Sequence, residues 1–429
     1  MGTAAGAAAR VAQRAASSAS LQAVSASRSD YHTLESQGMD FKLSPEQERF
    51  RAELRRWLEA NCPGDWGRIR SGLKTREAQA EFLIEWQRKL HAAGYVGLHW
   101  PVAYGGRGAT VLEQAIFYEE MARARAPELP NAIGLDMAGP ALIAHATEKQ
   151  KQAHLPRILS ADHIFCQGFS EPNAGSDLAA VQTRAERKNG YYVINGQKVW
   201  TSYAHYANWC ILLARTDPRA PKHKGLTFFI VDMASPGFTV RPLRQMSGDA
   251  EFNELYFDNL EVPAENVVGR ENGGWAVAIT TLMFERGPRA LSRQLILRQG
   301  IAELLELART QGRARDSVMR QRLAQAYIEA EVLRYANLRI LTRLIQGGEP
   351  GPEGSVSKLF FSETWQRTLE LGLELQGPYA ALWQGSARAV EDGWWQFRAV
   401  RSRGDTIAGG TSEIMRNILA ERVLGLPKD

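Results

Sequence analysis

The stretch TIAGGTSEIMRN, residues 406–417, combines residue types that bind anionic ligands. Two glycines lead into Thr411 and Ser412, and a pattern with helical spacing follows at once. Exposed backbone N–H groups, a hydroxyl and the helix dipole together favour phosphate at such a helix start. The residue before the Gly410–Thr411 pair is Gly409, which has no side chain for acid–base chemistry. This stretch therefore predicts a binding turn, and we expect the reactive group elsewhere.

A second candidate is CQGFSEPNAGSDLAAVQT, residues 166–183. Residues 172–175 predict a turn, and small residues let a backbone come close to a ligand. The hydroxyls of Ser170 and Ser176 can donate hydrogen bonds to polar ligand atoms. An ordinary structural turn explains the same residues, so local pattern alone leaves both interpretations open.

The third candidate is KVWTS, residues 198–202, at the end of a predicted strand. Trp200 and Ser202 are two positions apart, so both side chains are expected on one face. An aromatic ring beside a hydroxyl could hold a planar ligand, although a core tryptophan fits the pattern equally well.

Other common kinds of site have no matching pattern. The sequence contains no His-x-x-x-His pair and no Cys-x-x-Cys, and the HxxE spacing of His145 and Glu148 comes with no further ligand, so we expect no metal. Glycine-rich loops of the GxGxxG and GxxxxGK[ST] types are absent, as is a GxSxG nucleophile elbow. The three cysteines are far apart, which favours a reducing compartment.

Composition describes an ordinary globular chain of 429 residues, 44% hydrophobic and 23% charged, with two or three domains expected. The net charge of +5 is spread along the sequence, which suits an anionic small ligand and does not indicate nucleic acid. No apolar run reaches the roughly 18 residues of a membrane helix.

Residues 1–38 are rich in Ala, Ser and Arg, and we expect them to be a disordered leader. They resemble an organelle transit peptide, which would place the protein in the mitochondrial matrix. The other interpretation is a mis-assigned start, with Met39 as the true initiator. We expect a cytoplasmic protein, with the mitochondrial matrix as the alternative if residues 1–38 are a transit peptide.

The residue pattern of the remaining chain changes twice, from helical to strand-like and back to helical, and it predicts an α+β protein. Residues 39–163 form an N-terminal helical domain, with helices around 75–93, 110–125 and 137–160 and a capping box at Ser44–Gln47. Residues 164–270 contain strand patterns and two hairpin signals, Asn189–Gly190 and Asn195–Gly196. Residues 271–429 contain long helical patterns around 275–311, 317–346 and 355–376, with a fourth at 412–424, as in a bundle.

Five blocks now resemble the acyl-CoA dehydrogenase family in order and spacing: FSEPNAGSDLAAVQTRA, YYVINGQKVWTSYAHYANW, GLTFFIVDM, LEVPAENVVG and IAGGTSEIMRNILAERVLG. The resemblance covers the chain from Met39 onward. It implies an N-terminal helical domain, a central β-barrel and a C-terminal four-helix bundle. It also implies FAD as cofactor, which this family binds without a Rossmann loop.

Roles carried over from the resemblance fall on matching positions. Phe169 and Ser170 should line the flavin, Trp200 should pack on its ring system, and Ser202 should bond near N5. Ser176 should lie near the flavin phosphates and the CoA of the substrate. Thr411 and Glu413, in the first stretch, should hold the pyrophosphate and ribose.

The family reaction removes the α-proton and the β-hydride of an acyl-CoA, so a carboxylate base is needed. Many members place this glutamate where the present chain has Gly409. A minority place it on the first bundle helix, and the matching residue is Glu285 in TLMFERGPRA, with Arg286 as a substrate-binding neighbour. A structural ion pair with Arg286 or Arg289 is the alternative role for Glu285.

The resemblance implies an acyl-CoA dehydrogenase of fatty acid β-oxidation that forms the 2,3-enoyl-CoA and passes electrons to an electron-transferring flavoprotein. Ala308, Glu374 and the Gly377–Pro378 pair depart from the usual shared FAD contacts, and resemble a branch that assembles as mixed pairs. We therefore expect a dimer or tetramer of one or two chain types. The alternatives are a non-catalytic or half-site subunit of a mixed tetramer and a flavin oxidase or monooxygenase on the same fold.

Overall fold

The computed structural model describes residues 43–73, 75–284, 290–346, 351–352 and 354–428. The contacts within the chain define two units, residues 1–48 and residues 49–429. In the first unit the described residues begin helix α2 (Pro45–Asn61), where the capping box is confirmed: the Ser44 backbone N–H donates to Gln47 Oε1 at 2.8 Å, and the Gln47 N–H donates to Ser44 Oγ at 3.3 Å.

The second unit begins with helices, as the periodicity predicted. They are α3 (Trp66–Gly72), α4 (Arg76–Ala92), α5 (Val111–Arg123), α6 (Gly139–His145) and α7 (Glu148–Leu159), and a π-helical turn, η2 (Gly134–Ala138), leads into α6. Threonine side chains cap the starts of α4, α5 and α7. Helix α3 was not predicted, because its seven residues, WGRIRSG, show no helical period. The large core residue here is Trp100, whose indole packs against the Cα of Gly139.

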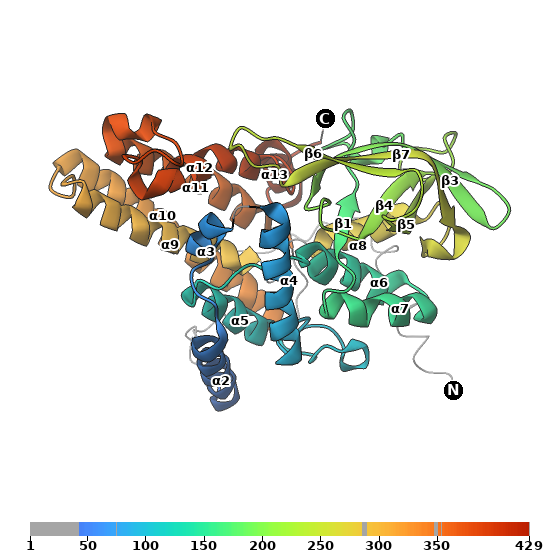
Figure 1. Ribbon diagram of the computed structural model, residues 1–429, viewed down its shortest axis with the longest axis horizontal. Coiled ribbons are helices and arrows are strands. Elements are labelled where there is room, and N and C mark those ends of the chain that lie inside the picture. The colour runs from blue at the N-terminus through green and yellow to red at the C-terminus, as the bar shows by residue number, and fades with distance from the viewer. Residues whose placement is uncertain (1–42, 74, 285–289, 347–350, 353, 429) are drawn as a thin grey trace, which may run out of the picture. The chain divides into compact units, whose positions relative to one another are not determined.

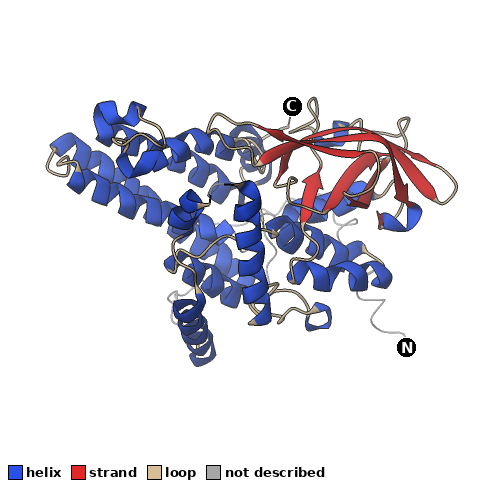
Figure 2. Cartoon of the chain, viewed as in Figure 1, coloured by secondary structure: helices blue, strands red, loops and turns tan. Residues whose placement is uncertain are grey.

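The middle region is one sheet of eight strands (red in Figure 2). The strands are β1 (Phe165–Gly168), β2 (Arg184–Arg187), β3 (Tyr191–Ser202), β4 (Trp209–Arg215), β5 (Leu226–Asp232), β6 (Phe238–Leu243), β7 (Phe252–Pro263) and β8 (Val267–Val268). Their order is β6-β7-β3-β2-β4-β5-β8, and β1 pairs with β4. The predicted closed barrel is wrong: within the described ranges β6 and β8 end the sheet without pairing to each other. Strand β8 has only two residues, and helix α8 (Gly274–Phe284) packs against the neighbouring β5.

The two hairpin signals have different outcomes. Asn189–Gly190 forms the predicted turn between β2 and β3, closed by the Lys188 N–H to the Tyr191 carbonyl at 2.8 Å. The hairpin predicted at Asn195–Gly196 is wrong, because β3 runs straight through and bulges there against β7. Gly196 is needed for close packing: a Cβ on it would lie 2.7 Å from Thr183 Oγ1.

The C-terminal region is a helical bundle. It contains α9 (Ala290–Thr310), α10 (Ser317–Ile345), α11 (Gly354–Gln376), α12 (Trp394–Arg401) and α13 (Ser412–Arg422). Helices α9, α10 and α11 lie side by side (Figure 1), and their shared core includes Leu304, Leu333, Leu369 and Trp395. The fourth helix in this core is α12 and not the predicted 412–424, since α13 buries only Ser412 and Met415. None of the helices in the described ranges is long and apolar enough to cross a membrane.

Candidate active site

The segment after β1 forms the predicted turn. Glu171 and Ala174 exchange two backbone hydrogen bonds of 3.0 Å, which leaves Ser176 exposed on the next few residues. Asp177 then pairs with Lys222 at 2.8 Å on the surface. The turn is therefore fixed at both ends, with a hydroxyl at its exposed part.

A buried ion pair holds this turn to strand β3. Lys198 Nζ donates to Glu171 Oε1 at 2.8 Å and to the Phe169 carbonyl at 2.9 Å, and its side chain is 0% exposed. Glu171 also accepts from the backbone N–H groups of Gln182 and Thr183 at 2.6 and 2.8 Å. Burial lowers the pKa of Lys198 to about 8. Burial alone would raise the pKa of Glu171, but the Lys198 charge and the hydrogen bonds hold it below its ordinary value.

The end of β3 presents an exposed aromatic ring. Trp200 is 60% exposed and has a left-handed backbone (φ +62°), beside a bulge in the β3–β7 pairing. Thr201 is buried, whereas Ser202 is half-buried, so Trp200 and Ser202 are the accessible side chains. The Val199 N–H donates to the Ser170 carbonyl at 2.9 Å, which brings Ser170 beside this strand end. A strained, exposed tryptophan next to two hydroxyls is suited to stacking a planar ligand.

Phe169 occupies a different environment. The residue is 4% exposed, and its ring packs edge-to-face with Phe228, with centroids 5.9 Å apart. Phe169 is therefore a core residue, and its carbonyl accepts a hydrogen bond from Lys198.

Side-chain contacts connect helix α12 of the bundle to the Trp200 ring through residues at the start of β7. Arg401 on α12 pairs with Glu251 Oε1 at 2.5 Å, and its guanidinium lies 5.3 Å from the centroid of Phe252. Phe252 in turn meets Trp200 edge to face, at 6.1 Å. Sequence reasoning missed Lys198, Glu171 and Arg401. The sequence gives little indication of their roles, since none of the three belongs to a pattern that predicts which residue it pairs with.

The first stretch forms a turn at the start of α13. Gly409 and Gly410 have left-handed backbones (φ +65° and +96°), and the buried Lys358 donates to the Gly410 carbonyl at 2.6 Å. Thr411 caps α13 by accepting from the Ile414 N–H at 3.2 Å. Hydrogen bonds from its own N–H and from Thr411 lower the pKa of the exposed Glu413. The turn thus has the donors and the helix start that a phosphate needs.

The chemistry of these donors fits FAD. The exposed Trp200 and the hydroxyls of Ser170 and Ser202 suit the ring system, and the α13 start suits the phosphates. The backbone hydrogen bond to Val199 joins Ser170 to the Trp200–Ser202 end of β3. No direct contact of the described residues joins Ser176, Thr411 or Glu413 to that group. Glu285 and Arg286 lie outside the described residues; α8 ends just before them, at Phe284.

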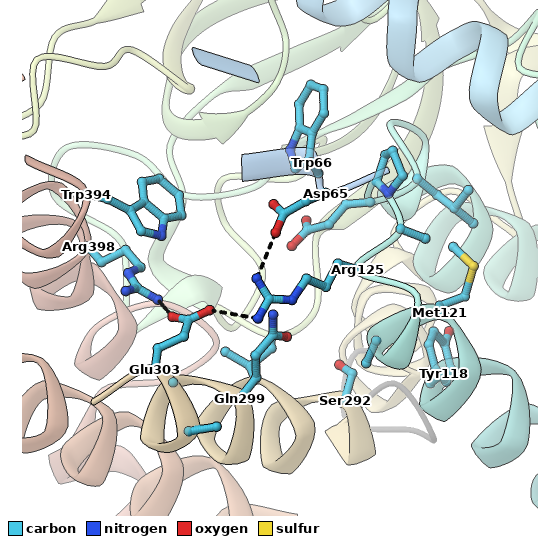
Figure 3. Close-up of a pocket in the computed structure, with 18 of the residues that line it drawn as sticks. Asp65, Trp66, Tyr118, Met121, Arg125, Ser292, Gln299, Glu303, Trp394 and Arg398 are labelled. Carbon is cyan, nitrogen blue, oxygen red and sulfur yellow. Dashed lines mark hydrogen bonds and ion pairs between the residues drawn. The ribbon is translucent and has the colours of Figure 1, made fainter. Parts of the chain in front are cut away.

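A pocket of about 870 Å³ lies between the N-terminal helices and the bundle (Figure 3). One wall comes from the end of α5 and the segment leading to η2, with Met121, Leu129 and Leu135. The opposite wall is α9, from Ser292 to Glu306. Ser292 is seven positions after Glu285 in the sequence.

The comparisons with known proteins cover the whole of this architecture. The chain matches the N-terminal, middle and C-terminal domains of acyl-CoA dehydrogenases over residues 44–162, 166–260 and 272–424. It is 43% identical over 397 residues to acyl-CoA dehydrogenase IpdE1 of Mycolicibacterium smegmatis, covering 90% of this chain and 99% of the relative.

Two solved structures are similar as well. The Tcur3481-Tcur3483 steroid ACAD is 31% identical with a TM-score of 0.81, over 91% of this chain and 100% of that one. The ChsE4-ChsE5 complex from Mycobacterium tuberculosis is 32% identical with a TM-score of 0.77, again over 91% and 100%. Family matches along the chain, a close full-length relative and the shared fold agree: this protein belongs to the acyl-CoA dehydrogenase family, and is an FAD-dependent oxidoreductase of lipid metabolism.

Proposed function

We propose that this protein dehydrogenates a bulky, ring-containing acyl-CoA to the 2,3-enoyl-CoA. The observation that carries the proposal is the pocket of about 870 Å³ beside the start of α9. Its walls include Phe117, Ile296 and Trp394, which offer the aromatic and aliphatic surface that a fused-ring acyl group buries. The similarity to IpdE1 supports the family reaction, and the similarity to the steroid ACAD supports a steroid-derived substrate.

Glu285 is the proposed base. It removes the proton from the α-carbon, and bound FAD would supply the acceptor for the hydride of the β-carbon. A carboxylate in a pocket closed from water has a raised pKa and is a stronger base. Gly409, at the position where many members have their base, cannot take this role. Arg286 would hold the substrate beside Glu285.

The remaining residues bind and orient. Trp200 would stack on the flavin, Ser170 and Ser202 would donate hydrogen bonds to its edge, and Phe169 would line its site. Thr411 and Glu413 hold the pyrophosphate and ribose through the start of α13. Ser176, exposed beyond its turn, is placed to reach the CoA.

We further propose an oligomer, and an electron-transferring flavoprotein as the acceptor. Helix α10 has an exposed apolar stripe, Ile328, Val332 and Tyr335 with Tyr327 beside it, each side chain 49–52% exposed. The i, i+4, i+7 spacing puts three of them on one face, as in an interface. The similarity to the ChsE4-ChsE5 complex supports a mixed assembly, and the bacterial origin of IpdE1 supports a cytoplasmic location.

The test is anaerobic flavin bleaching by a panel of linear and fused-ring acyl-CoAs, with wild type and Glu285→Gln compared. We expect fused-ring thioesters to bleach the wild type, and Glu285→Gln to slow bleaching at least about 1,000-fold, because the amide cannot take a proton. The control is Glu261→Gln, an exposed carboxylate on β7 that should have no effect.

Four results would contradict parts of the proposal. If Glu285→Gln bleaches as fast as wild type, Glu285 is not the base. If linear chains are preferred, the ring-containing substrate is wrong. If the reduced protein is reoxidised rapidly by air, the oxidase alternative replaces the dehydrogenase. If the protein binds FAD but its flavin bleaches only when a second chain is present, it is a half-site subunit.

A further inference from the structure

The pocket ends in a row of charged side chains. Arg125 NH1 donates to Asp65 Oδ2 at 2.8 Å, and Arg125 NH2 lies 3.8 Å from Glu303 Oε1. Glu303 Oε2 accepts from Arg398 NH1 at 2.6 Å, so the four groups alternate in charge across the pocket (Figure 3). Glu303 lies about 16 Å along α9 from Ser292, given the helical rise. The row is therefore about three turns along α9 from Ser292, which lies near the start of that helix.

Arg125 is held in a conformation that arginine rarely adopts. Its N–H bonds to the Ala122 carbonyl and the next N–H, of Ala126, bonds to the Met121 carbonyl, both at 3.0 Å. These two bonds form a Schellman motif that ends α5, and Arg125 (φ +51°) stands at the position where glycine is usual. An arginine there costs on the order of 1 kcal/mol of backbone strain. The strain indicates that the side chain at this position is needed.

The donors of Arg125 are only partly used. Of its five N–H groups, the hydrogen bonds made to other described side chains use one, to Asp65. The second cation of the pocket, Arg398, is more buried: its NH1 pairs with Glu303 and its guanidinium lies 4.6 Å from the Trp395 ring centroid. Its Nε and NH2 are buried and have no hydrogen-bond partner among the described residues. The Arg125 side chain is 46% exposed, so its free donors are accessible to a ligand.

The charge around the pocket excludes one class of ligand. Besides Asp65 and Glu303, five carboxylates line it: Glu128, Asp136, Glu306, Glu391 and Asp392. Seven carboxylates against two guanidinium groups repel a substrate with a second carboxylate at its far end. A neutral oxygen, in contrast, accepts a hydrogen bond from Arg125 and carries no charge to be repelled.

We propose that Arg125 selects acyl-CoA substrates whose far end carries a neutral oxygen, a ketone or a hydroxyl. This inference rests on the proposed function, and adds a specificity-determining residue to it. A site built to donate a hydrogen bond rejects the analogue that lacks the acceptor, because the bound analogue covers the donor and leaves it unpaired. A plain hydrocarbon pocket would make no such distinction.

The experiment compares four CoA thioesters of one fused-ring acid that differ at a single distal ring carbon: ketone, hydroxyl, methylene and carboxylate. The FAD-loaded protein is used in the oligomer in which it purifies, and kcat/KM is measured with an electron-accepting dye. For the wild type we expect the ketone or the hydroxyl to exceed the methylene compound by about 10- to 100-fold. The carboxylate should be the poorest of the four.

Two variants and a control test whether Arg125 causes the preference for the oxygenated compounds. In Arg125→Met the preference for the oxygenated compound over the methylene compound should fall to within about threefold, and Arg125→Lys should retain part of it. Arg184→Met, an exposed arginine on β2, should keep the wild-type ratio. The ratio is taken within each variant, so a general loss of stability or activity cancels.

The outcomes separate the two proposals. If the methylene compound reacts as well as the ketone and the hydroxyl, or if the carboxylate reacts best, the role of Arg125 is wrong while the dehydrogenase function stands. An unchanged ratio in Arg125→Met has the same meaning. If the wild type turns over none of the four and none bleaches its flavin, the proposed function fails, and the inference fails with it.

Discussion

The buried pair of Lys198 and Glu171 decides how the proposed flavin site is held. Lys198 bonds to both Phe169 and Glu171, which precede the turn, and it stands two residues before Trp200. One side chain thus fixes both segments that are proposed to contact the ring system. The desolvation of such a pair is expensive, so its contribution is conformational rather than a net gain in stability.

Replacing Lys198 by Met should lower the free energy of unfolding by about 3–5 kcal/mol, because Glu171 is left buried and unpaired. FAD should also be lost on purification, because Lys198 no longer holds together the two segments that are proposed to contact its ring system. Adding Glu171→Gln should restore part of the stability by removing the buried charge. Urea unfolding followed by circular dichroism, together with the flavin absorbance per chain, measures both effects.

Lys222→Met is the matched control, since Lys222 pairs with Asp177 at the same 2.8 Å on the surface. It should cost less than about 1 kcal/mol. Equal losses for Lys198→Met and Lys222→Met would rule out a special role for the buried pair.

At the scale of single residues, the sequence pointed to the groups that are proposed to contact a ligand and not to those that hold them. Ser170, Trp200, Ser202 and Thr411 belong to recognisable motifs. Lys198 was part of the quoted KVWTS stretch, but its role depends on Glu171, which is 27 positions away in sequence. Pairing across that distance is a property of the fold.

At the scale of elements, glycine determines how closely the bundle helices pack. A Cβ on Gly372 of α11 would lie 2.2 Å from Trp395 Cε3 on α12, and a Cβ on Gly300 of α9 would lie 2.3 Å from Trp365 Cζ3 on α11. Two tryptophans are thus accommodated only because the facing positions have no side chain.

Gly372→Ala should therefore destabilise the protein by about 1–3 kcal/mol, through overpacking against Trp395. Helix propensity alone predicts the opposite, a gain of up to about 1 kcal/mol. The control is Gly354→Ala at the start of the same helix, where a Cβ would meet nothing within 4 Å. Urea midpoints of the three proteins decide between the two effects, and a stabilised Gly372→Ala would show that the tryptophan can move.

Element identity was predictable where periodicity is strong, as in α4, α10, α11 and β5 to β7. The errors arose where local pattern and tertiary packing disagree. Asn195–Gly196 has the composition of a hairpin turn, but Thr183 packs where a Cβ would be, and the strand continues. Closure of the sheet depends on how the end strands β6 and β8 meet, which no local pattern encodes.

At the scale of the whole molecule, the exposed stripe on α10 is the strongest indication of assembly. Val332→Glu should shift the protein to a smaller species in size-exclusion chromatography with light scattering, because a charge cannot be buried in an apolar interface. Met246→Glu serves as control, since Met246 is 77% exposed on the loop after β6. An oligomer that survives Val332→Glu at low micromolar concentration would place the interface elsewhere.

The turn before α13 also limits what a substitution can introduce there. Gly409 is left-handed, at φ +65°, so a glutamate introduced there would add about 1–2 kcal/mol of backbone strain and project from an unusual direction. Under the proposed function, Gly409→Glu alone would therefore be a poor replacement for Glu285 as the base.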